Sequence, residues 1–332
     1  GAECRNVREK VGLLDISGFS RYEVTGPKAE SWLNRLMASK LPKPGRARLA
    51  PMLAPSGRLQ GDLTVFNWGD GTWWIMGSYY LRAWHMRWFN SHLEDGVKVR
   101  DLGEDIAGFS LAGPNSLKVI GKLTDGDIAA LPFMGCGQFD IGLVQARVAR
   151  MSVAGELGYE INCRMGDHIA LRRMLLGAGA DLGIGEYGFN ALLSLRLEKS
   201  FGIWSAEFRQ EYTPGMTGMD RWIDWEKGDF IGREAALAER DGNGPAKHLV
   251  TLEVDAGDAD ASGYEPVWAD GRLAGFVTSG GYGHTVGKSL AMALVDREYA
   301  GEGTALSVHV VGVERAARVI APSPYDPQGK AM

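Results

Sequence analysis

One pattern of hydrophobic and polar positions occurs twice in the first half of the chain. Each copy has a short apolar run, a Gly-Pro turn and then apolar residues at helical spacing, which predicts a strand followed by a helix. The first copy extends from Tyr22 to Leu36 and the second from Phe109 to Leu123. Between them, residues 63–66 and 73–76 flank Gly69-Asp70-Gly71, which is typical of a β-hairpin. The two copies suggest an internal structural repeat.

The pattern changes in the last quarter of the chain. Helical periodicity is still present at residues 168–176 and 187–199, but Gly, Asn and Pro cluster at residues 241–245. Beyond this cluster, short apolar runs alternate with turns, which predicts a small barrel or sandwich. These runs are residues 249–254, 267–268, 273–277 and 306–310. We therefore expect two domains, residues 1–241 and 246–332.

Composition narrows the class of protein. The 332 residues are 45% hydrophobic and 23% charged, with a net charge of -5, which does not favour nucleic acid as the main partner. No apolar stretch approaches the roughly 20 residues of a membrane-spanning helix, so no membrane partner is expected. The start of the chain shows no signal peptide. The three cysteines lack metal-type spacing, which fits a reducing, cytoplasmic compartment.

Two carboxylates interrupt predicted strands and are the first candidates for chemistry. Asp62 opens the apolar run of residues 63–66, and Glu160 lies within Gly158-Tyr159-Glu160-Ile161. Each could simply lie on a solvated strand end or face. In a cleft, Asp62 would accept a proton or stabilise a developing cation, whereas Glu160 would accept N–H donors from a planar heterocycle.

A third candidate is the segment that follows the predicted helix of residues 187–199. The helix breaks at Gly202, and a polar loop then carries Trp204, Glu207 and Glu211. The tryptophan could belong to the core and the glutamates could be solvated. The six histidines show no metal-ligand spacing, and no nucleophile elbow is present. The Gly-rich segments 177–183 and 278–284 lack the context of a phosphate loop. A bound organic cofactor is therefore the more plausible source of chemistry.

Seven segments taken together resemble the aminomethyltransferase family of the glycine-cleavage T-protein, in the order and near the spacing of that family. The segments are residues 11–17, 24–27, 57–65, 112–114, 155–161, 195–199 and 275–280. Lys199-Ser200-Phe201 and Trp204-Ser205-Ala206-Glu207 look closer to the C-terminal region of dimethylglycine and sarcosine dehydrogenases. The resemblance implies an α+β fold with ferredoxin-like subdomains around a central channel, and a C-terminal β-barrel.

The resemblance also implies a cofactor, tetrahydrofolate, and roles for individual residues. Asp62 matches the family's catalytic carboxylate, and Glu160 matches the carboxylate that grips the pterin. The other expected cofactor contacts are Phe19, Met52, Tyr159, Trp204 and Glu207. No metal is expected. One departure is Val153, which stands where the family often has a tyrosine.

The implied function is capture of a methyl-derived one-carbon unit, as iminium or formaldehyde, from a methylated amine to form 5,10-methylenetetrahydrofolate. A flavin-dependent or other oxidising domain or subunit would supply that unit, because no flavin or NAD fingerprint precedes the first motif. Two alternatives remain open. One is direct demethylation that yields 5-methyltetrahydrofolate, and the other is a folate-binding scaffold without chemistry.

Overall fold

The computed structural model describes residues 1–332 and divides into two compact units. The first unit contains residues 1–50, 63–191 and 331–332, and the second contains residues 51–62 and 192–330. The second unit therefore includes a short segment from early in the chain. No helix is long and apolar enough to cross a membrane.

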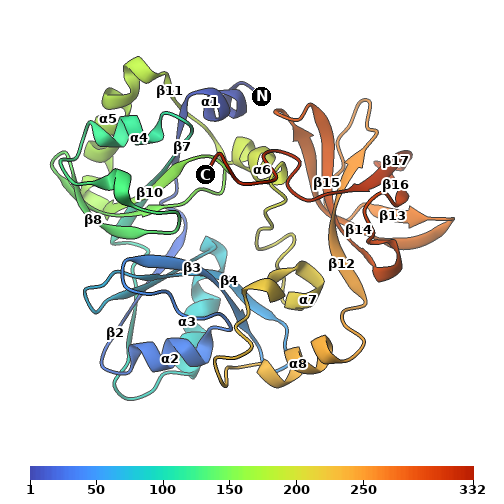
Figure 1. Ribbon diagram of the computed structural model, residues 1–332, viewed down its shortest axis with the longest axis horizontal. Coiled ribbons are helices and arrows are strands. Elements are labelled where there is room, and N and C mark those ends of the chain that lie inside the picture. The colour runs from blue at the N-terminus through green and yellow to red at the C-terminus, as the bar shows by residue number, and fades with distance from the viewer. The chain divides into compact units, whose positions relative to one another are not determined.

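A six-stranded sheet in the order β11-β1-β7-β10-β9-β8 forms one half of the first unit (Figure 1). Its strands are β1 (Val11–Asp15), β7 (Ile106–Ala112), β8 (Cys136–Ile141), β9 (Val144–Arg150), β10 (Gly158–Arg164) and β11 (Ile184–Glu186). The helices α4 (Ser116–Gly121) and α5 (His168–Gly179) share a hydrophobic core with one face of this sheet. Tyr159 and Ile161 belong to that core, so the alternation of β10 turns Glu160 to the opposite face.

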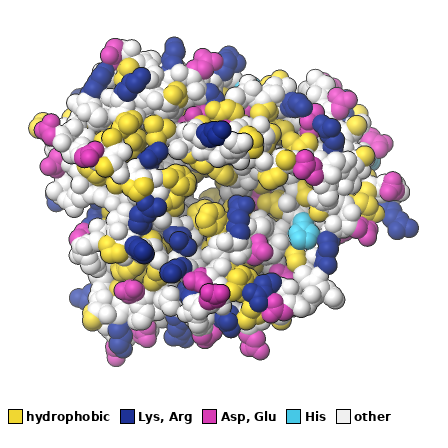
Figure 2. Space-filling view, in the orientation of Figure 1, with side chains coloured by type: hydrophobic (Ala, Val, Ile, Leu, Met, Phe, Trp, Pro, Cys, Tyr) yellow, Lys and Arg dark blue, Asp and Glu magenta, His cyan; other side chains and the backbone are white.

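A five-stranded sheet in the order β3-β4-β5-β2-β6 forms the other half. Its strands are β2 (Ser20–Thr25), β3 (Arg46–Leu53), β4 (Leu59–Asn67), β5 (Trp73–Gly77) and β6 (Lys98–Asp101). The predicted hairpin is present, because β4 and β5 pair antiparallel around Gly69 and Gly71, which both have positive φ. On the face shown in Figure 2, Lys and Arg side chains gather over β3 although the net charge of the chain is negative.

The repeated Gly-Pro turns have the same physical basis in both copies. Gly26 connects β2 to α2 (Ala29–Leu36) with φ 114°, and Gly113 connects β7 to α4 with φ 130°. In each case a Cβ atom would overlap a backbone oxygen of a neighbouring segment. Only glycine combines this backbone conformation with such close approach. The helices α1 (Ala2–Glu9) and α3 (Arg82–Ser91) complete the first unit.

The second unit ends in a closed six-stranded barrel in the order β12-β15-β14-β13-β16-β17 (Figure 1). Its strands are β12 (Lys247–Val254), β13 (Pro266–Ala269), β14 (Arg272–Gly283), β15 (Lys288–Asp296), β16 (Ala305–Val310) and β17 (Val313–Ile320). Alternate residues such as Leu252, Val267 and Val308 are fully buried and form its core. The predicted C-terminal barrel is therefore confirmed, because these strands close on themselves and do not form the alternative sandwich.

Three helices precede the barrel: α6 (Phe189–Leu197), α7 (Pro214–Thr217) and α8 (Arg233–Asp241). The turn between β3 and β4 packs with this part of the second unit. The Leu59 N–H donates to the carbonyl oxygen of Tyr212 at 2.9 Å, and Gly57, with φ 77°, lies against Ala235 of α8. The predicted domain boundary falls in the connection between α8 and β12.

Candidate active site

Glu160 is a buried carboxylate in the first unit. Its side chain lies on β10, and the residue is only 4% exposed. One carboxylate oxygen, Oε2, is buried and has no hydrogen-bond partner. Burial raises the pKa of Glu160 to about 7, and the positive charge of Arg21 opposes that rise. A buried acceptor without a donor is costly, so this oxygen is suited to a ligand N–H group.

Arg21 on β2 explains how this carboxylate is accommodated. The guanidinium is fully buried and donates from Nε to Asn162 Oδ1 at 2.7 Å. It also donates to the carbonyl oxygens of Ile16 at 3.0 Å and Phe19 at 2.9 Å. Burial lowers the pKa of Arg21 to about 10, and Glu160 counteracts this effect. Arg21 therefore remains charged at neutral pH and ties β2 to the polar face of β10.

Phe19 and Tyr159 are the other predicted cofactor contacts in the first unit. Phe19 is partly exposed in the turn between β1 and β2, and its carbonyl oxygen accepts from Arg21. Tyr159 is 1% exposed and packs among core residues such as Leu111 on the other face of β10. Tyr159 thus points to the face opposite Glu160, because adjacent strand residues alternate, and its contact with a cofactor stays a prediction.

Asp62 is the corresponding carboxylate of the second unit. The residue is the one partly exposed position of β4, but its Oδ1 atom is buried and has no hydrogen-bond partner. Burial raises the pKa of Asp62 to about 7; its own backbone N–H and that of Trp204 oppose the rise, and the charge of Glu207 adds to it. Asp62 therefore exchanges a proton near neutral pH, which is the property expected of a general acid or base.

Glu207 holds the segment that follows α6. Its fully buried carboxylate accepts from Arg196 Nη1 and from the Ile203 N–H, both at 3.0 Å on Oε2. On Oε1 it accepts from the hydroxyl groups of Thr278, at 2.7 Å, and Ser279 of β14. Protein donors thus occupy both oxygens, and a contact with a ligand would have to displace one of them.

The residues on either side of this network are also anchored inside the second unit. Glu198 accepts from the backbone N–H groups of Thr285 and Val286 at 2.6 and 3.1 Å. Lys199 donates to the carbonyl oxygens of Tyr325 and Asp326 at 3.1 and 2.7 Å. Much of the segment that attracts attention in the sequence therefore connects α6 to the barrel and to the C-terminal tail.

Met52 and Trp204, the remaining candidates, are both buried in the second unit. Met52 is fully buried near the end of β3, and Trp204 is 5% exposed. Trp204 forms a backbone β-bridge with Phe208, and its backbone N–H favours the ionised form of Asp62. The side chains of Met52 and Trp204 can provide apolar surface.

Sequence reasoning missed several groups that shape the two carboxylate environments. Arg21 and Asn162 are polar residues within strands that are otherwise buried. A polar residue in such a strand is a signal in the sequence that could have marked both as functional candidates. Tyr187 is buried, and burial together with the charge of Glu160 raises the pKa of its phenol to about 12. Thr278 and Ser279, which donate to Glu207, lie in the Gly-rich segment 278–284, whose sequence carries no signal for this role.

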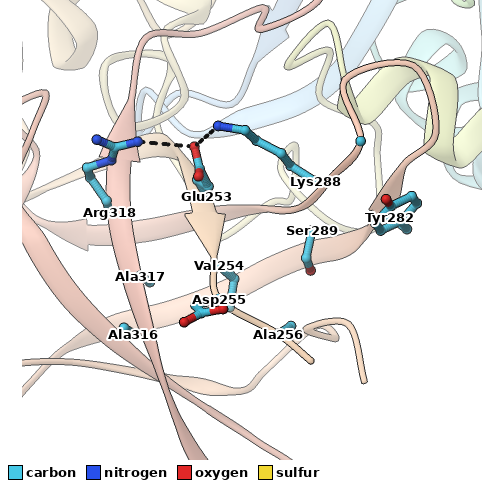
Figure 3. Close-up of a pocket in the computed structure, with 11 residues that line it drawn as sticks. Glu253, Val254, Asp255, Ala256, Tyr282, Lys288, Ser289, Ala316, Ala317 and Arg318 are labelled. Carbon is cyan, nitrogen blue, oxygen red and sulfur yellow. Dashed lines mark hydrogen bonds and ion pairs between the residues drawn. The ribbon is translucent and has the colours of Figure 1, made fainter. Parts of the chain in front are cut away.

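A hollow of about 500 Å³ on the barrel has a different character (Figure 3). Its central carboxylate, Glu253, accepts from Lys288 Nζ at 2.7 Å and from Arg318 Nη2 at 3.2 Å. The hydrogen bond from Lys288 holds the pKa of Glu253 below its ordinary value. This carboxylate is ionised and paired, so it lacks the proton chemistry of Asp62 and Glu160.

Each of the two desolvated carboxylates, taken by itself, fits an N–H donor of an organic ligand. Glu160 Oε2 and Asp62 Oδ1 are acceptors that the protein leaves without donors. Carboxylate oxygens pair well with amide and amino N–H groups of a heterocycle. The structure groups no three His, Cys, Asp or Glu side chains that could hold a metal ion.

Comparisons with known proteins agree on one fold. Two family models match: the GCVT N-terminal domain over residues 1–227 and the glycine cleavage T-protein C-terminal barrel domain over residues 247–326. The crystal structure of the glycine cleavage system aminomethyltransferase T from Bartonella henselae matches with a TM-score of 0.90 at 24% identity. That match covers 98% of this chain and 89% of the other, which confirms the predicted α+β fold with its barrel.

Curated relatives fall into two groups. The chain is 31% identical over 312 residues to the aminomethyltransferase of Bacillus subtilis (strain 168). The aligned region covers 93% of this chain and 86% of that relative. It is 31% identical over 326 residues to the mitochondrial dimethylglycine dehydrogenase of Mus musculus, which covers 96% of this chain. The chain spans only 37% of the length of that dehydrogenase.

Proposed function

Because this chain belongs to the glycine-cleavage T-protein family, as its motifs predicted, we propose that it transfers a one-carbon unit from a methylated amine to tetrahydrofolate. Tetrahydrofolate is the one-carbon acceptor of the aminomethyltransferases in this family. When bound, it supplies the nitrogen atoms that receive the carbon, and the expected product is 5,10-methylenetetrahydrofolate. The observation that best supports this proposal is the pair of desolvated carboxylates with unpartnered oxygens.

Glu160 is proposed to hold the pterin ring. Its unpartnered Oε2 atom can accept an N–H donor of the ring, which would satisfy a buried acceptor. Arg21 keeps a positive charge near this carboxylate and favours its ionised form, which accepts hydrogen bonds more strongly. Asn162 orients Arg21 through a 2.7 Å hydrogen bond and is a positioning residue in this scheme.

Asp62 is proposed to move a proton and to stabilise positive charge during the transfer. Its pKa of about 7 means that both protonation states are populated at neutral pH. The ionised form attracts a developing cation strongly, because little water screens it. The Trp204 backbone N–H lowers the pKa of Asp62 and so favours this ionised form.

Phe19, Met52 and Trp204 are proposed to provide apolar surface for the folate, as the family resemblance implies. Glu207 is assigned a supporting role instead, since protein donors occupy both of its oxygens. Val153 does not supply the hydroxyl group that the family often has at this position.

The source of the one-carbon unit is proposed to be a separate oxidising domain or subunit, flavin-dependent or of another type. The matched dehydrogenase is much longer than this chain, which supports the idea that such relatives join this fold to further domains. The oxidising partner would convert an N-methyl group to formaldehyde or an iminium ion.

Calorimetric titration of the chain with tetrahydrofolate under anaerobic conditions tests the proposal. Glu160→Gln should weaken binding by about tenfold or more, because a charged acceptor is lost. Glu253→Gln is a matched control, because that carboxylate is already paired on the barrel, and it should bind normally. Failure of the folded wild-type chain to bind tetrahydrofolate would contradict the proposal.

Product analysis then separates the enzyme reactions. With formaldehyde as donor, the chain should accelerate formation of 5,10-methylenetetrahydrofolate, and Asp62→Ala should lower that rate by about 10²-fold. Formation of 5-methyltetrahydrofolate from a methylated donor would instead support direct demethylation. Tight binding with no turnover for any donor would support a scaffold.

A further inference from the structure

Four cross-strand neighbours form the last row of side chains at one end of the β-barrel. In strand order they are Ala317 of β17, Val254 of β12, Ser289 of β15 and Tyr282 of β14. Val254 and Ala317 belong to the apolar core of the barrel, so this row faces its interior. All four line the hollow of about 500 Å³ described above (Figure 3). The hollow therefore opens at the mouth of the barrel, which is a common position for small-molecule sites.

Ser289 is a polar member of this row that has no partner. The residue is only 6% exposed, and its hydroxyl oxygen, Oγ, is buried without a hydrogen bond. A buried hydroxyl group without a partner costs free energy, and an alanine at this position would avoid that cost. Figure 3 shows Ser289 between Val254 and Tyr282 in the wall of the hollow. Its hydroxyl group is therefore suited to a hydrogen bond with a ligand.

One side of the hollow carries cations with unused donors. Lys288 and Arg318 share a single carboxylate, that of Glu253, at 2.7 and 3.2 Å, so the three side chains together carry one positive charge. The Lys288 side chain is 50% exposed and that of Arg318 is 58% exposed. Each cation has further N–H groups that Glu253 does not use. This side of the hollow can therefore bind the carboxylate of a ligand.

The other side of the hollow carries a negative charge. Asp255 follows the last residue of β12, and its backbone N–H donates to the carbonyl oxygen of Ala316 at 2.8 Å. Its side chain is exposed and forms no ion pair. In Figure 3, the Asp255 carboxylate and the Glu253 carboxylate with its two cations lie on opposite sides of Val254. Asp255 is thus available to an ammonium group of a ligand.

We propose that the mouth of the barrel binds a free α-amino acid with an apolar side chain. Lys288 and Arg318 bind its carboxylate with the help of the Ser289 hydroxyl group, and Asp255 binds its ammonium group. Its side chain lies against the ring of Tyr282, which is 43% exposed. A ligand with a single charge would satisfy only one side of the hollow. The site shares no residue with the proposed folate site, so the inference does not rest on the proposed function.

Calorimetric titration of the full chain with three matched probes tests this proposal. L-Phenylalanine carries both charges, 3-phenylpropionate carries only the carboxylate, and phenethylamine carries only the ammonium group. L-Phenylalanine should bind about tenfold more tightly than either of the others, because each of them loses a charged hydrogen bond. In amide NMR spectra it should shift the signals of Gly287, Ser289 and Ala317. No binding of L-phenylalanine, equal binding of a probe with one charge, or shifts confined to other residues would overturn the proposal.

Variants then test the individual contacts. Asp255→Asn should weaken binding of L-phenylalanine by about tenfold and leave that of 3-phenylpropionate unchanged, because only the ammonium group loses its partner. Ser289→Ala should weaken binding of both without lowering Tm, because the hydroxyl group has no partner in the folded chain. Asp296→Asn is the matched control: its carboxylate pairs with Lys247 at the opposite end of the barrel, and both affinities should stay the same.

An equal effect of Asp255→Asn on both probes, or an equal effect of Asp255→Asn and Asp296→Asn on L-phenylalanine, would overturn the proposal. All of these measurements are made without tetrahydrofolate. Failure of folate binding is therefore a separate outcome that leaves this test intact.

Discussion

The fold stabilises the ionised form of some carboxylates in this protein and destabilises the ionised form of others. Asp62 has a folded-state pKa of about 7, against 3.8 for a free side chain. The folded state therefore binds the proton more tightly, so stability falls as the pH rises from about 4 to about 7, and the loss is complete above about 7. Residues selected for reactivity commonly carry such a penalty.

Asp62→Asn should remove this penalty, because the amide has no charge to desolvate. We expect the free energy of unfolding to increase by ~1–2 kcal/mol at about pH 8, and by much less at about pH 4, where Asp62 is protonated in the folded state. Urea unfolding at both pH values measures this difference. A variant that is less stable than wild type at the higher pH would contradict the argument.

At the scale of elements, the turn after α6 depends on close packing. A Cβ atom at Gly202 would overlap the ring of Phe208, so Gly202→Ala should lower the free energy of unfolding by ~1–3 kcal/mol. Gly177→Ala in α5 is the matched control: its Cβ meets open space, and the change should stabilise by about 0.5–1 kcal/mol. Equal effects of the two variants in thermal unfolding would refute this view of the turn.

Elements with local patterns could be predicted from the sequence, whereas buried polar partnerships could not. Alternating apolar residues identified the hairpin and the barrel, because each strand shows one face to its own core. Arg21 donates to Asn162, which lies 141 positions further along the chain, so only the tertiary structure brings the two together. The partners of Glu207 were not foreseen for the same reason, since nothing local indicates that Thr278 and Ser279 donate to it.

At the scale of the whole molecule, ligand binding and folding are coupled. If tetrahydrofolate binds only the folded chain, a concentration of 100 times Kd should raise the free energy of unfolding by about 2.7 kcal/mol. Differential scanning calorimetry with and without tetrahydrofolate measures this. Glu160→Gln should reduce the rise at the same ligand concentration, while Glu253→Gln should retain it. A rise of equal size in both variants would argue against a role of Glu160 in binding.

The assignment of residues 51–62 to the second unit has a consequence for synthesis of the chain. Their partners begin at residue 192, so the β3–β4 turn leaves the ribosome well before the segments that will cover it. At about 5–20 residues per second, this delay lasts roughly 6–26 seconds. During that time the apolar end of β3, with Met52 and Leu53, is exposed to other nascent chains and to chaperones. The segment that ends at Asp62 is thus covered late in the synthesis of the protein.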